Sequence, residues 1–197
     1  MSSNNNTRAR KRRFSRRLVL PIVIFVAVAL AVAWFFDEQA TSTVIIVRHA
    51  EKAAAPKDDP VLSPAGKLRA QALADMLSDV DVIAGVDAIY VSESRRTRDT
   101  AKPLANRLDL ALFEHPAADV KGLAERILDE HKGEIVLVVG HSDTVPALIR
   151  EFGGSKKVPP IEEHEYTNLY ILSMPWSGKT KTLRLKYANT YLDAGDT

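Results

Sequence analysis

Two histidines in this sequence each follow a run of branched apolar residues that has the pattern of a buried strand. Arg48-His49 comes directly after residues 44–47, and His141 comes one residue after 135–139. A histidine ring is a nitrogen nucleophile or general base with an ordinary pKa of about 6.5. A guanidinium group binds phosphate-like anions with two parallel hydrogen bonds. Because ligands of open α/β sheets bind at the carboxyl ends of the strands, we expect both histidines to lie together at that edge.

A third segment brings more positive charge to the same edge. Residues 90–101 leave a predicted strand and enter a helix, and Arg96 lies at that transition. Two arginines and two histidines at one point would form an electropositive pocket that fits a tetrahedral dianion. The helix predicted to begin near Thr144 would add backbone N–H groups and the positive end of its dipole. One histidine would then attack phosphorus, while the other groups spread the charge on the equatorial oxygens.

The rest of the chain predicts the elements that would position these residues. Apolar runs and alternating segments predict strands, and apolar positions three to four residues apart predict helices. The expected strands cover residues 44–47, 87–91, 110–113, 134–139, 168–174 and 182–187. One helix is expected to begin at Ser63-Pro64, and the others cover residues 97–108, 120–131 and 144–152. This alternation is typical of a three-layer α/β/α domain with a mostly parallel sheet, closed by an antiparallel hairpin.

The N-terminal part differs from the rest of the chain in charge and hydropathy. Residues 1–17 hold seven of the 27 basic residues and none of the 25 acidic ones, so the remainder is mildly acidic. We therefore expect no nucleic-acid partner. Residues 18–36 carry no charge, and as a helix they would be about 28 Å long, close to the hydrocarbon thickness of a bilayer. The sequence predicts a basic cytoplasmic segment (1–17), a transmembrane anchor (18–36), a linker (37–42) and a single domain (43–197).

The basic block also predicts an orientation in the membrane. By the positive-inside rule the N-terminus lies in the cytoplasm and the domain outside the cytoplasmic membrane, which is the periplasm in a two-membrane bacterium. Two alternatives for the N-terminal segment stay open. Ala31-Val32-Ala33 could be a cleavage site, which would make the segment a signal peptide. Ser15-Arg16-Arg17 partly resembles a twin-arginine signal. The domain is exported in each case.

Two other features narrow the chemistry. The sequence has no cysteine, which excludes disulfides, thiolate catalysis and cysteine-ligated metals. His164 stands in an acidic run with Glu162, Glu163 and Glu165. Metal ligation by this run is conceivable, but we interpret it as a solvated loop.

Three motifs in this order resemble those of the histidine phosphatase superfamily, which includes cofactor-dependent phosphoglycerate mutases and histidine acid phosphatases. Arg48-His49-Ala50-Glu51 is similar to the R-H-G/A-E signature of that family. Ser92, Arg96 and Thr100-Ala101 are similar to its S-x-x-x-R-x-x-x-T-A segment, and Gly140-His141-Ser142 is similar to its second histidine motif. The resemblance covers the chain from residue 43 to the end. Alanine after the first histidine resembles the small phosphatases with R-H-A-E-K and argues against a mutase.

The resemblance implies a role for each of these residues. His49 would be the nucleophile that forms a phosphohistidine. Arg48, Arg96 and His141 would bind and stabilise the transferring phosphoryl group, with no metal and no organic cofactor. The proton donor stays open. Glu114, Asp119 and Glu125 lie in the region where many family members carry a carboxylate, whereas Asp143 comes one residue after the place, filled here by Ser142, where the acid-phosphatase branch has an aspartate. Asp119 could instead cap the helix that follows it, and some small members act on good leaving groups without a donor.

These observations predict a membrane-anchored, extracytoplasmic phosphatase with the phosphoglycerate mutase-like fold. Its substrate would be a phosphorylated small molecule or cell-envelope component, either a phosphomonoester or a phosphohistidine protein. The short segments between the motifs leave no room for a deep lid, so the pocket would be open. Two rivals are a phosphoglycerate mutase-like phosphotransferase and a non-catalytic module that binds a phosphorylated envelope component.

Overall fold

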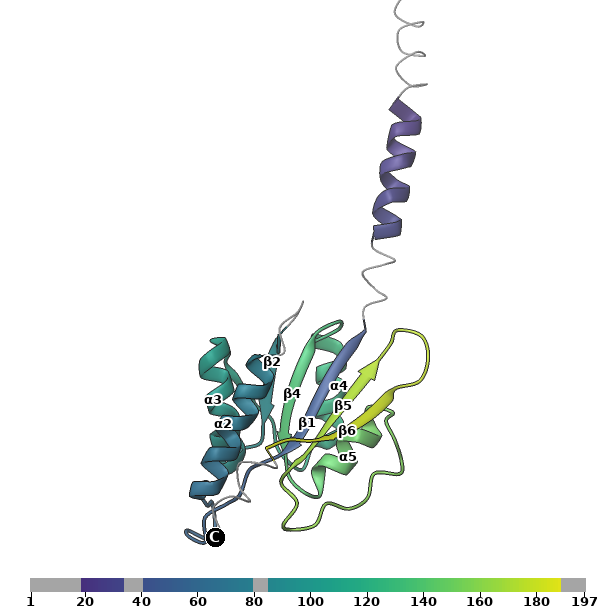
Figure 1. Ribbon diagram of the computed structural model, residues 1–197. Coiled ribbons are helices and arrows are strands. Elements are labelled where there is room, and N and C mark those ends of the chain that lie inside the picture. Colours follow the sequence, from purple (N-terminus) through teal and green to yellow (C-terminus); the bar gives the residue numbers. More distant parts are fainter. Residues whose placement is uncertain (1–18, 34–40, 80–84, 189–197) are drawn as a thin grey trace, which may run out of the picture. The chain divides into compact units, whose positions relative to one another are not determined.

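The computed structural model describes residues 19–33, 41–79 and 85–188 (Figure 1). The chain divides into two compact units, residues 1–40 and 41–197. In the first unit, residues 19–33 form a helix whose side chains are exposed. Within the described ranges, no helix has both the length and the hydropathy needed to cross a membrane. The predicted basic segment, both ends of the predicted anchor and most of the predicted linker lie outside the described residues.

The second unit is built on one six-stranded mixed sheet. Its strands are β1 (Ser42–Arg48), β2 (Ala88–Val91), β3 (Leu112–Glu114), β4 (Ile135–Gly140), β5 (Asn168–Met174) and β6 (Lys181–Lys186). They lie in the order β3-β2-β4-β1-β5-β6. The first four strands are parallel to one another, whereas β5 pairs antiparallel with β1 and β6 pairs antiparallel with β5. The predicted α/β fold with a largely parallel sheet and a closing hairpin is confirmed.

Two helices cover each face of the sheet. Successive residues of a strand point to opposite faces, so the apolar residues of β1 pack against helices on both sides. Val44 and Ile46 of β1 belong to the core beneath α4 (Val120–Glu130) and α5 (Thr144–Glu151). Ile45 and Val47 belong to the core beneath α2 (Pro64–Ser78) and α3 (Arg95–Leu108). Figure 1 shows these two pairs of helices on the two sides of the sheet. The arrangement is the predicted three-layer one.

At both ends of α3 the structure differs from the prediction by two residues. The helix begins two residues before Thr97, after Ser94. At its other end Asp109 adopts a left-handed conformation with φ 54°, and Leu110 N donates to Ala105 O at 2.9 Å. Leu110 therefore still belongs to the helix terminus, which is why β3 begins at Leu112 and not at the predicted residue 110.

The start of α2 packs directly on the loop that follows β1. Ser63 caps the helix by accepting a hydrogen bond from Gly66 N at 3.0 Å, and its own N–H donates to Glu51 O at 2.9 Å. A Cβ at Gly66 would lie 2.2 Å from that carbonyl oxygen. Only glycine allows the helix to approach the loop so closely, so α2 fixes the backbone two residues beyond His49.

Candidate active site

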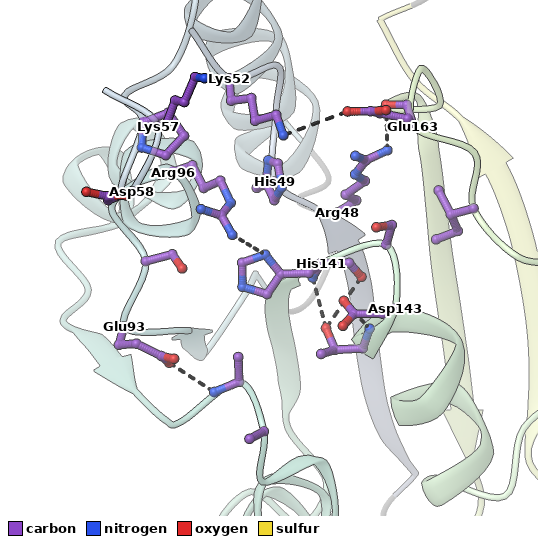
Figure 2. Close-up of a pocket in the computed structure, with 17 residues that line it drawn as sticks. Arg48, His49, Lys52, Lys57, Asp58, Glu93, Arg96, His141, Asp143 and Glu163 are labelled. Carbon is purple, nitrogen blue, oxygen red and sulfur yellow. Dashed lines mark hydrogen bonds and ion pairs between the residues drawn. The ribbon is translucent and has the colours of Figure 1, made fainter. Parts of the chain in front are cut away.

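Adjacent parallel strands bring the predicted site residues to one edge of the sheet. In the β1–β4 pair, Arg48 lies opposite Gly140, and His49 N donates to Gly140 O at 2.9 Å. β2 pairs with the other side of β4, so Ser92 leaves the sheet at the same edge. Figure 2 shows Arg48, His49, Arg96 and His141 around a common space. The structure therefore brings together all four residues that the sequence predicted.

These four side chains line a cavity of about 880 Å³. Arg48 and Arg96 supply positive charge to this cavity. The cavity wall carries other charged residues of both signs, namely Lys52, Lys57, Asp58, Glu93, Asp143 and Glu163. The cavity is large enough for a phosphoryl group together with a sizeable remainder of a substrate.

His49 is held with one ring nitrogen protonated and the other bare. Its side chain is buried, with 4% exposed, and Nδ1 lies 2.8 Å from Ala50 O. Because a carbonyl oxygen only accepts, Nδ1 carries the proton and Nε2 keeps its lone pair. Burial, followed by the charges of His141, Arg96 and Arg48, lowers the pKa of His49 to about 3, against the opposing effect of the Ala50 carbonyl. The ring is therefore neutral and nucleophilic at neutral pH.

The His141 ring packs against the His49 ring and forms hydrogen bonds with two other residues. The two ring centroids are 5.3 Å apart at 64°. Arg96 Nη2 is 3.2 Å from His141 Nδ1, and Ser92 Oγ is 2.9 Å from His141 Nε2. A guanidinium only donates, so Nδ1 is the acceptor and Nε2–H donates to Ser92. Burial, and then the charge of Arg96, lowers the pKa of His141, so this ring is also neutral when it contacts Arg96.

The family model of the histidine phosphatase superfamily (branch 1) matches residues 44–119 of this chain. Residues 44–119 belong to the histidine phosphatase superfamily. This range includes Arg48, His49 and Arg96, and His141 joins them through the β1–β4 pairing. The family match supports the predicted phosphatase. No protein among the curated sequences matches the chain.

Solved structures of two phosphatases and a hydrolase have the same fold as the second unit. The protein histidine phosphatase SixA, in complex with tungstate, is 18% identical, with a TM-score of 0.58 over 73% of this chain and 96% of SixA. A mycobacterial glucosyl-3-phosphoglycerate phosphatase is 16% identical, with a TM-score of 0.56 over 75% of this chain and 98% of its own. The mycobacterial hydrolase 2 is 16% identical, with a TM-score of 0.59 over 78% and 94%. At this identity the likeness shows the fold.

Of the predicted proton-donor candidates, only Asp143 lines the cavity. It caps α5, and its Oδ1 accepts from Thr144 N at 2.9 Å. Glu114 does not line the cavity and pairs with Arg98 at 3.0 Å. Asp119 is also outside the cavity and caps α4 by accepting from Gly122 N at 3.0 Å, as the alternative interpretation had it. Glu125 pairs with Lys121 on the surface of α4.

Glu93 lines the cavity but was not among the residues that the sequence singled out. Its Oε2 accepts from Ala117 N at 2.9 Å, as Figure 2 shows. Hydrogen bonds from its own N–H and that of Ala117 lower the pKa of Glu93, and the charges of His141 and Arg96 act in the same direction. Glu93 is therefore ionised and a poor proton donor at neutral pH. Its hydrogen bond connects the α3 side of the cavity to the loop before α4. Its position one residue after Ser92 was the only sequence signal for it.

Proposed function

We propose that this protein is a membrane-anchored, extracytoplasmic phosphatase that hydrolyses phosphomonoesters or phosphohistidine through a phosphohistidine intermediate on His49. The observation that carries the proposal is the bare Nε2 of His49 beside Arg48, Arg96 and His141. It is supported by the hydrogen bond from Nδ1 to Ala50 O, which leaves Nε2 as the nucleophilic nitrogen.

The reaction proceeds in two displacements at phosphorus. His49 Nε2 attacks, an N–P bond forms, and the bond from phosphorus to the leaving oxygen or nitrogen breaks with its electron pair on the leaving group. Water then attacks phosphorus, the N–P bond breaks, and inorganic phosphate leaves with His49 restored. Arg48, Arg96 and His141 stabilise the equatorial oxygens in both steps.

The hydrogen bonds of Glu93 and Asp143 favour substrates whose leaving group needs no proton from the enzyme. Glu93 is held ionised by two backbone N–H groups, and Asp143 accepts from the first N–H of α5. A substrate whose leaving group departs without a proton from the enzyme suits this arrangement, as a phosphohistidine or an aryl phosphate does. Alkyl phosphates, such as sugar phosphates, should react more slowly because an alkoxide is a poor leaving group.

Rapid quenching of the purified full-length chain during turnover tests the phosphohistidine intermediate. The chain is mixed with ³²P-labelled phosphohistidine protein, aryl phosphate or sugar phosphate, and quenched in base, in which phosphohistidine survives. We expect label on residue 49 and release of inorganic phosphate, with both lost in His49→Asn. Transfer of label to an added alcohol without phosphate release would favour the phosphotransferase. Tight binding without turnover would favour the binding module.

The anchor is supported by the sequence: residues 18–36 carry no charge and follow seven basic residues. Because the chain has no cysteine, single cysteines can be introduced and labelled in intact cells with an impermeant maleimide. Ser177→Cys lies on the exposed turn between β5 and β6 and should be labelled. The matched Ser3→Cys should be labelled only after lysis. The reverse pattern would refute the proposed orientation.

A further inference from the structure

The acidic loop between α5 and β5 holds Arg48 by its backbone. Arg48 Nη1 donates to the carbonyl oxygens of Glu162 at 2.8 Å, Glu163 at 2.9 Å and Glu165 at 3.2 Å. Figure 2 shows Arg48 and Glu163 facing each other at the cavity. The two protons of Nη1 are thus shared among three carbonyls, and this end of the guanidinium is fully used by the protein.

The carboxylates of Glu163 and Glu165 in the same loop interact with groups other than Arg48. Glu163 Oε1 lies 3.8 Å from Lys52 Nζ, and Glu165 Oε2 accepts from Glu162 N at 3.0 Å. Carbonyl oxygens orient a guanidinium without cancelling its charge, whereas a carboxylate would neutralise it. Arg48 is therefore fixed in place and keeps its positive charge for an anion.

The loop leaves one edge of Arg48 for that anion. In a guanidinium, Nε–H and one N–H of Nη2 point in the same direction and form a fork. Arg69 uses this fork to hold Glu51 in the same protein, with Nε 2.9 Å from both carboxylate oxygens and Nη2 2.6 Å from Oε1. Over the described part of the chain, the buried Nε of Arg48 has no hydrogen-bond partner. The fork of Arg48 is thus the edge that the protein itself does not use.

Tyr166 covers one face of the same guanidinium. The Cζ atom of Arg48 lies 4.2 Å from the centroid of the Tyr166 ring, within the range of a cation–π interaction. The ring centroids of Tyr166 and His49 are 6.2 Å apart. The carbonyls hold one end of the guanidinium and the ring holds its plane, so together they fix both the direction and the tilt of the fork.

We infer that Tyr166 is a positioning residue, which together with the carbonyls of Glu162, Glu163 and Glu165 orients the Nε/Nη2 fork of Arg48 toward the phosphoryl group. The inference rests on the proposed function, because it supplies the ligand for that fork. Tyr166 acts through Arg48, and the ring face rather than the hydroxyl is what it contributes.

The test compares Tyr166→Leu with Tyr166→Phe in the full-length chain, using inhibition of aryl phosphate hydrolysis by inorganic phosphate. Tyr166→Leu should weaken phosphate binding on the order of 3- to 30-fold, the span of a cation–π interaction, while Tyr166→Phe stays within about 2-fold of wild type. In an Arg48→Gln background, Tyr166→Leu should weaken phosphate binding by no more than about 2-fold, because the face it covered is gone. A simple packing role would give the same loss in both backgrounds.

A second cation–π contact supplies the matched control. Arg126 lies over the Phe113 ring, 6.0 Å from its centroid, and neither residue lines the cavity. Phe113→Leu should leave phosphate inhibition unchanged. Wild-type phosphate affinity in Tyr166→Leu would overturn this inference alone, as would equal losses in Tyr166→Leu and Tyr166→Phe. A wild-type chain that neither binds phosphate nor forms a phosphohistidine would overturn the proposed function and this inference with it.

Discussion

The hydroxyl of Thr100 accepts a hydrogen bond of 2.9 Å from Ala50 N, the residue whose carbonyl receives Nδ1–H of His49. The same hydroxyl donates to Arg96 O at 2.7 Å. Thr100 and Ala50 are both fully buried. One hydroxyl group thus connects the backbone next to His49 with the helical turn that carries Arg96. This contact gives a physical reason for a threonine four residues after Arg96.

Replacing Thr100 by valine should cost about 1–3 kcal/mol of unfolding free energy, because the N–H of Ala50 is left buried without a partner. The backbone that holds the His49 tautomer would also loosen, so kcat should fall more than the affinity for phosphate. Urea unfolding and steady-state kinetics measure the two effects. Thr100→Ser keeps the hydroxyl and should stay close to wild type. Equal behaviour of the valine and serine variants would show that the hydroxyl does not matter.

The lowered pKa of His49 predicts how stability depends on pH. Burial lowers that pKa from 6.5 to about 3, so between these values the unfolded chain binds a proton that the folded chain does not. The contribution of neutral His49 to the free energy of unfolding is complete above pH 6.5 and is lost as the pH falls toward 3. The slope is up to about 1.4 kcal/mol per pH unit for this one group.

Urea unfolding without phosphate at pH 7 and pH 5 measures this slope. His49→Gln should lose less stability than wild type over that interval, and the remaining loss should include the part due to the lowered pKa of His141. His164→Gln, which removes an exposed histidine of the acidic loop, should lose as much as wild type. An identical pH dependence in His49→Gln and wild type would contradict the assignment.

The ion pair between Glu51 and Arg69 connects the loop after His49 to α2. Arg69 is 5% exposed, and its fork holds both oxygens of Glu51. Glu51→Ala would leave the guanidinium buried without a counter-ion, which should destabilise the fold by about 3–5 kcal/mol. Asp75→Ala removes the partner of Arg107 on the surface of α2 and should change stability by less than about 1 kcal/mol. Thermal or urea unfolding compares the two, and similar losses would rule out a buried pair as the cause.

The sheet and the four converging side chains could be predicted because their signals are local. Apolar runs at residues 44–47 and 135–139 mark interior strands, and the rule that parallel strands end at one edge brings His49 and His141 together. The boundary of β3 could not be predicted, since it depends on the left-handed conformation of Asp109, a non-glycine residue.

The contacts around Arg48 could not be predicted from the sequence either. The acidic run around His164 was interpreted as a solvated loop from its side chains, but three of its backbone carbonyls hold Arg48. Carbonyl groups are the same in every residue, so no pattern of residue types indicates which of them point inward. Glu93 and Tyr166 lie in loops. The spacing of strands and helices in the sequence does not determine where a loop places its side chains.

The direction of β1 has a consequence for the approach of substrate. The chain enters this strand at Ser42 and leaves it at Arg48, so whatever precedes the domain is tied to the opposite end of a strand about 23 Å long. The cavity at the other end of β1 therefore stands a full strand length from the point where the chain enters the sheet.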